Sequence, residues 1–169
     1  MVDVADLLKT GGQLAYNVFD TFREDAGNAF ESFFVPVDRL DAALRAKGLP
    51  GRLVSPGHLI VGAERGDRIY QGLKKTTIDF LREEPDSKLV QYEKSLIEGI
   101  LLADEAVGQA KQGYDAAKQV KGKLLRAGED LKAADMQALV SQAESKFEEA
   151  KAKKLALEAS KEAVQESRG

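Results

Sequence analysis

The sequence predicts an all-α protein with a Phe-rich N-terminal helical unit, a short extended insert, and a long C-terminal antiparallel helical hairpin or coiled-coil-like rod. Residues 1–85 contain all four prolines and six of the seven phenylalanines. Residues 86–169 contain no proline and 15 alanines, together with many Lys, Glu and Gln residues that lose little freedom on entering a helix. Apolar residues recur at three- and four-residue steps through most of the chain. We therefore expect two structural parts, residues 1–85 and 86–169.

A first helix is predicted over about residues 3–34. Its apolar positions fall on one face at helical spacing, and that face is rich in phenylalanine. The Gly11-Gly12 pair is expected to bend or break it, because an internal glycine costs about 1 kcal/mol relative to alanine. Pro36 is expected to end this element. The aromatic residues expected to contact a partner or another copy are Phe19, Phe22, Phe30, Phe33 and Phe34.

A short second helix is predicted over about residues 38–47, with Leu40 and Leu44 on its apolar face. Gly48 follows as the expected left-handed cap, since glycine adopts a positive φ without the steric cost of a Cβ atom. Leu49 is the expected apolar companion of this cap, and the proline after it prevents continuation of the helix. Gly48 is therefore predicted to be a turn residue.

Residues 49–63 are too rich in proline and glycine for a predicted helix, so we expect an extended segment here. Pro56 and Gly57 suit the two central positions of a type II turn. The apolar run Leu59, Ile60 and Val61 requires burial and is expected to dock on the N-terminal unit or on a neighbouring subunit. Helix resumes over about residues 64–84, and Pro85 is expected to end it.

The C-terminal half is predicted to form two helical arms around Gly128. Residues 88–127 and 129–168 are equal in length, which favours an antiparallel hairpin that turns at Gly128, although one continuous bent helix fits the same pattern. The apolar seam of the second arm is expected to start at Leu131. Both seams are rich in alanine and glycine and bury little apolar area, so we expect the arms to need the N-terminal half or other subunits.

Composition argues against most catalytic chemistry. The chain has no cysteine and one histidine, His58, which is expected to be a turn residue beside the Pro-Gly corner rather than a catalyst. We expect no enzyme activity, no cofactor and no metal site. The basic residues concentrated in residues 111–126 lie near a predicted helix end and have no interleaved aromatic residue beyond Tyr114, so nucleic-acid binding is not expected either.

These observations predict a non-enzymatic structural or assembly protein, part of a larger homo- or hetero-oligomeric particle, with a virion or another self-assembled component as a plausible setting. The alternative is a membrane-associated or scaffold-binding adaptor that uses the amphipathic N-terminal helix; the acidic polar face of that helix argues against anionic lipid. No secretion signal or apolar membrane span is recognisable, so a cytoplasmic location or one inside an assembled particle is expected.

Overall fold

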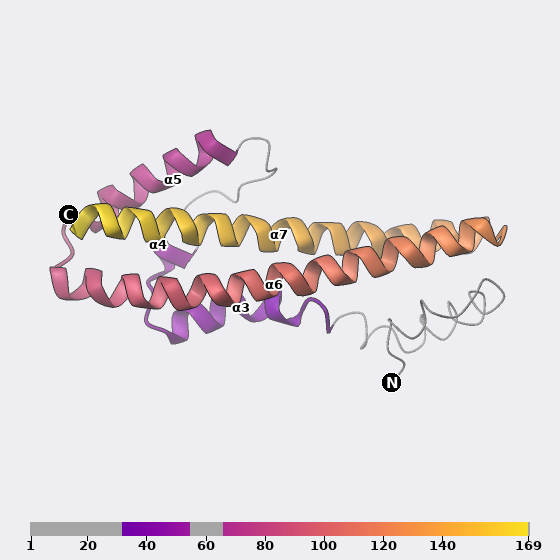
Figure 1. The fold of residues 1–169 in the computed structure, drawn as a ribbon, viewed down its shortest axis with the longest axis horizontal. Helices are drawn as coiled ribbons and strands as arrows, with labels where there is room; N and C mark the ends of the chain where they lie inside the picture. Colours follow the sequence, from indigo (N-terminus) through magenta and orange to yellow (C-terminus); the bar gives the residue numbers. More distant parts are fainter. Residues whose placement is uncertain (1–31, 55–65, 169) are drawn as a thin grey trace. The chain divides into compact units, whose positions relative to one another are not determined.

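The computed structural model describes residues 32–54 and 66–168, which form helices and turns without strands (Figure 1). The all-α prediction is confirmed over this part of the chain. The helices, in chain order, are α3 (Val35–Ala46), α4 (Gly51–Val54), α5 (Gly66–Leu81), α6 (Asp86–Arg126) and α7 (Asp130–Arg168). The predicted helix over residues 3–34 lies almost entirely outside the described residues, as do residues 55–63 of the predicted extended insert.

The helices α6 and α7 pack against each other in antiparallel orientation, as Figure 1 shows. The predicted helical hairpin is therefore confirmed, and the alternative of one continuous bent helix is wrong. Gly128 stands in the turn with φ of 76°. The amide of Gly128 donates to the Leu125 carbonyl at 3.1 Å, and the amide of Glu129 donates to the Leu124 carbonyl at 2.9 Å. These two bonds are the Schellman pattern that ends a helix at a left-handed glycine.

The helix α3 begins earlier than the sequence predicts. It starts at Val35, so Pro36 lies in its first turn, while the element that Pro36 was expected to end lies almost entirely outside the described residues. The first turn has no intrahelical partner for its amides, so a residue without an amide hydrogen costs nothing there. At the other end, Gly48 has φ of 88°, and the amide of Leu49 donates to the Leu44 carbonyl at 3.4 Å. Leu49 is buried beside this cap.

Residues 51–54 form the short helical turn α4, where an extended segment was predicted. The reason is local: the Pro50 carbonyl accepts a hydrogen bond from the Leu53 amide at 3.0 Å, which closes the turn. Leu53 is fully buried, so the turn directs an apolar side chain into the core. The helix α5 ends at Leu81, three residues before the predicted end, and Pro85 lies between it and α6.

The structure divides into two compact units, which are described separately. Of the described residues, the first unit joins residues 32–36 with Gly108–Phe147, and the second joins residues 37–54 and 66–107 with residues 148–168. Each unit therefore combines segments that are distant in sequence. The predicted division at residues 85 and 86 stays a prediction.

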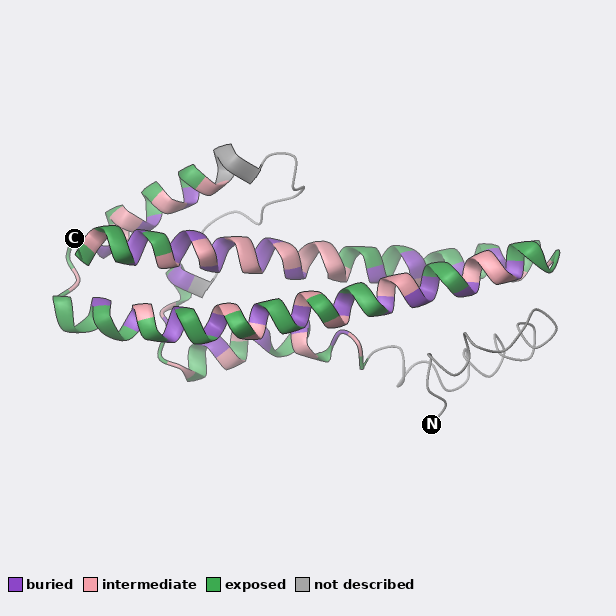
Figure 2. Cartoon of the chain, viewed as in Figure 1, coloured by how far each residue is buried: buried purple, intermediate pink, exposed green. Residues whose placement is uncertain are grey.

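In the second unit, leucines of α3 and α4 pack with buried residues of α6 and α7, which recur at intervals along both long helices (Figure 2). Hydrogen bonds also join these helices. Lys153 of α7 donates to Asp41 of α3, and the Ser160 hydroxyl donates to the Leu53 carbonyl at 3.3 Å. The buried residues of this cluster are Leu40, Leu44, Leu49, Leu53, Leu81, Leu89, Tyr92, Leu96, Ala103, Leu157, Ala163 and Val164.

In the first unit, small side chains line the contact between the two arms. Ala110, Gly113 and Ala117 of α6 are buried, as is Ala143 of α7. A Cβ atom at Gly113 would lie 2.9 Å from the Phe33 Cβ atom and 2.9 Å from the Phe34 ring, so only glycine allows this approach. One predicted seam position is wrong: Leu131 is 85 % exposed, because it lies just past the turn.

Candidate interaction surfaces

The outer face of α6 in the second unit carries a row of exposed apolar side chains. Val90, Ile97 and Leu101 are 50 %, 43 % and 67 % exposed. They are spaced by seven and four residues and therefore lie above one another on one side of the helix. Leu89, Tyr92, Leu96 and Ala103 lie on the opposite side and are buried. We call Val90, Ile97 and Leu101 the outer strip.

A surface depression of about 320 Å³ lies on the outer strip. Four of its lining residues, Val90, Glu93, Lys94 and Ile97, follow the i, i+3, i+4, i+7 pattern of one helix surface. This four-residue arrangement is the one that receives an inserted side chain in coiled-coil packing. Glu98 and Arg168 complete the wall.

Acidic side chains flank the outer strip, and ion pairs within the same unit balance three of them. Glu93 pairs with Arg168, Glu98 pairs with Lys47 at 3.0 Å, and Asp104 pairs with Lys154 at 2.8 Å. The hydrogen bond from Lys47 lowers the pKa of Glu98, and the hydrogen bond to Asp104 raises the pKa of Lys154.

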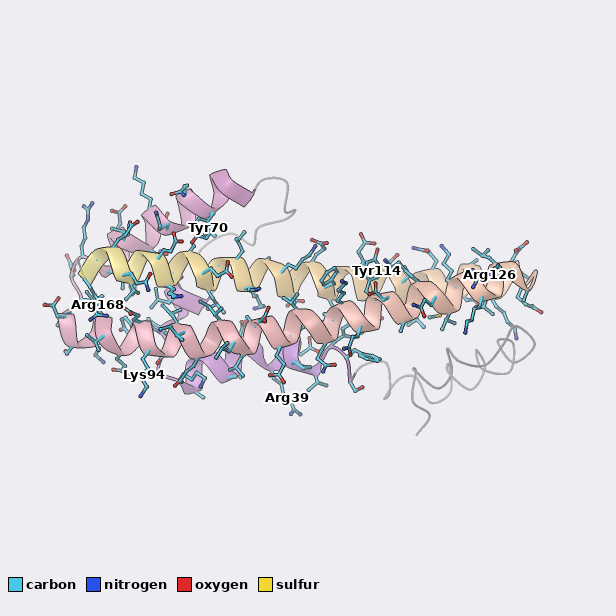
Figure 3. The ribbon with its side chains drawn as sticks, in the orientation of Figure 1. Arg39, Tyr70, Lys94, Tyr114, Arg126 and Arg168 are labelled. Carbon is cyan, nitrogen blue, oxygen red and sulfur yellow. The ribbon has the colours of Figure 1, made fainter. Side chains whose placement is uncertain are left out.

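Lys94 differs from these neighbours, since no salt bridge to it occurs in the part of the chain that the structure describes. Figure 3 shows its side chain on the side of α6 that faces away from α7. The outer strip is thus flanked by internally compensated acids and by Lys94, whose charge adds to the effect of Lys47 in lowering the pKa of Glu98.

A second exposed apolar site lies in the first unit at the hairpin turn, where Leu125 is 50 % and Leu131 is 85 % exposed. Cations and acids alternate closely around it, with Arg126 and Lys132 beside Glu129 and Asp130. The two leucines are separated by the turn and do not form a row along one helix. This site has fewer exposed apolar residues than the outer strip, and they follow no helical spacing.

A polar cluster of the second unit joins α5 to α7. The Tyr70 hydroxyl donates to the Glu158 carbonyl at 3.4 Å, and Lys74 donates to Glu166 at 2.9 Å. Burial and the nearby carboxylates, Glu162 first among them, raise the pKa of the Tyr70 phenol well above its ordinary value of 10.0. The phenol therefore stays protonated near neutral pH, and the cluster fixes α5 on α7 without providing a base.

The residues singled out from the sequence have different positions. Phe19, Phe22, Phe30, Leu59, Ile60, Val61, Pro56 and Gly57 lie outside the described residues, as does His58. Phe33 is partly exposed, whereas Phe34 is 2 % exposed and packs within its own chain beside Gly113. The structure places Gly48 and Gly128 at positive φ and Pro85 between α5 and α6.

The sequence interpretation missed the outer strip. It followed the inner seam through Leu89, Tyr92 and Leu96, and it left Val90, Ile97 and Leu101 unassigned. A signal was present, because these three residues repeat the heptad spacing one position further along the helix. A second apolar row on a helix that already has one apolar face is the sequence signal that would identify the outer strip.

Within residues 32–54 and 66–168, no cluster of three or more His, Cys, Asp or Glu side chains is placed to hold a metal ion. A search of the same residues for helices that are long and apolar enough to cross a membrane found none. Comparison of the chain with protein-family models, curated proteins and solved structures gave no match.

Proposed function

We propose that this chain is a non-enzymatic structural or assembly component that acts by association with other protein subunits in a larger homo- or hetero-oligomeric particle, such as a virion or another self-assembled component. The observation that carries the proposal is the outer strip, where Val90, Ile97 and Leu101 are exposed in a row. Isolated exposed hydrophobic residues are ordinary, but residues aligned at heptad spacing suit a partner helix.

The energetics favour association. Burial of apolar area contributes about 25 cal/mol per Å², so covering three half-exposed aliphatic side chains is worth about 2–4 kcal/mol per copy. In the second unit α3 and α4 pack on the buried faces of α6 and α7, and α5 packs on α7, so among the described residues these helices leave the outer face of α6 uncovered. Ion pairs that hold Glu93, Glu98 and Asp104 reduce the repulsion that would oppose contact.

The proposal is tested by the mass of the full-length protein in solution over a wide concentration range, by sedimentation equilibrium. We expect species heavier than the 18.4 kDa single chain, with the proportion rising with concentration. Circular dichroism at each concentration controls for a change in helicity. A protein that stays monomeric throughout and melts in one sharp, concentration-independent transition would contradict self-assembly.

A further inference from the structure

We infer that the partner of the outer strip is a second copy of the same chain, and that two α6 helices meet there in antiparallel orientation about a twofold axis near Ile97. This inference rests on the proposed function, since it names the partner of the same surface. Two observations point to it: a protruding side chain and a matching depression share one helix face, and the flanking charges are self-complementary.

The first observation concerns shape. Leu101 is the most exposed residue of the strip at 67 %. The depression lined by Val90, Glu93, Lys94 and Ile97 lies on the same face, centred about two helical turns before Leu101. A surface that carries both a knob and a hole is complementary to itself under a twofold rotation. The midpoint between the two is Ile97, so the axis passes there.

The second observation concerns charge. Lys94, Glu98 and Glu105 lie on one side of the outer strip, because they are spaced by four and seven residues. In an antiparallel twofold pair, the same sides of the two helices face each other. Each Lys94 therefore faces the acidic residues Glu98 and Glu105 of the second copy, and the arrangement occurs twice.

The other side of the strip carries Glu93 and Asp104, which would face each other across the contact. Both already have a cation of their own chain, Arg168 and Lys154 respectively. Their charges are therefore balanced before the copies meet. In a parallel pair, Leu101 would instead lie beside Leu101 of the second copy, and the depression would receive no side chain.

The extent of the strip sets the strength of the contact. From Val90 to Leu101 the strip covers 12 residues, or about 18 Å of helix. A contact of this length buries less area than a standard stable complex, in which each partner buries about 800 Å². The contact between two copies is accordingly concentration-dependent, and a covalent trap is the appropriate probe.

The test uses single cysteines in the full chain, which has none of its own. Ile97→Cys places the thiol at the axis, and Val90→Cys is the matched control on the same strip. Val90 is seven residues from Ile97, so two Val90 positions lie about 20 Å apart in the antiparallel pair. That distance is far beyond the reach of a disulfide.

Under mild oxidation, Ile97→Cys is expected to give a covalent dimer at least tenfold faster than Val90→Cys. Equal cross-linking of both variants would indicate a parallel pair and overturn the inference, and absence of dimer from both would overturn it as well. Circular dichroism before oxidation establishes that each variant is folded.

A second measurement separates this inference from the proposed function. Leu101→Glu is expected to shift the dimer dissociation constant upward at least tenfold, whereas Leu131→Glu, at the exposed hairpin turn, leaves it unchanged. If Leu101→Glu associates like the parent protein and Ile97→Cys does not cross-link, the surface is wrong while the assembly proposal stands. If the parent protein is monomeric at every concentration, self-association fails altogether.

Discussion

At the scale of single residues, Tyr70 shows how tertiary contacts set the behaviour of an ordinary side chain. Its ring packs near Ala152, Ala156 and Ala159 of α7, while its hydroxyl lies among glutamates of the same helix. A phenolate there would be both desolvated and close to like charges. Folding therefore favours the protonated phenol.

This contact predicts that the stability of the folded protein decreases at alkaline pH. Because the folded pKa is raised, the contribution of Tyr70 to stability is complete below the unfolded pKa of about 10 and is lost as the pH rises through the folded value. Of the four tyrosines, Tyr70 is expected to ionise last in an ultraviolet titration. Tyr70→Phe should remove the latest transition. A titration curve that keeps that transition in the variant would assign it to another tyrosine.

At the scale of helices, close approach depends on glycines at defined positions. Gly99 of α6 lies against α3, and a Cβ atom there would overlap Leu44 Cδ2. Leu44 is 1 % exposed, so its side chain has little space into which to move. Gly108 of the same helix is different, since nothing lies within 4 Å of the position of its Cβ.

These two glycines provide a matched pair of substitutions. Gly99→Ala is expected to destabilise the protein by about 1–2 kcal/mol, because overpacking of a core typically costs about 1–3 kcal/mol and the better helix propensity of alanine recovers only part of it. Gly108→Ala should stabilise it by up to about 1 kcal/mol. Urea unfolding followed by circular dichroism measures both. A Gly99→Ala protein as stable as the Gly108→Ala protein would show that α3 adjusts freely.

At the scale of the whole molecule, α3 holds the hairpin arms of the second unit through an ion pair as well as leucines. Lys153 is 8 % exposed and its ammonium contacts Asp41, whose side chain is 42 % exposed. The two partners therefore differ in their exposure to solvent. Loss of Asp41 leaves a buried ammonium without its counter-charge, whereas loss of Lys153 leaves a carboxylate that water can still solvate.

This asymmetry predicts the outcome of a double-mutant cycle. Asp41→Ala is expected to cost about 1–2 kcal/mol, less than the 3–5 kcal/mol for a fully buried pair because Asp41 is partly solvated. Lys153→Met should cost less than Asp41→Ala, and adding Asp41→Ala to Lys153→Met should cost little more. The free energies of unfolding of all four proteins test this. Equal costs for the two single variants would mean that burial of Lys153 does not matter.

Much of the fold follows from local sequence. Gly48 followed by Leu49 defines the end of α3, and the proline-free, alanine-rich C-terminal half defines two long helices around Gly128, because capping and helix propensity are properties of short segments. At prolines the local rules identified only part of the structure. Pro50 follows the end of α3 as expected, but Pro36 and Pro50 also lie at the start of a helix, since a proline is compatible with a first turn and incompatible only with an interior.

The sequence by itself determined that this protein is helical, where its two long helices turn, and which leucines of residues 38–49 are apolar enough to be buried. The tertiary structure alone decided which face of α6 stays exposed, because Val90 and Leu89 are equally apolar neighbours and differ only in which side α3 and α7 cover. It also decided that the first residues past the turn, including Leu131, lie in solvent. Periodicity identifies apolar faces, but only packing shows which of them are already covered.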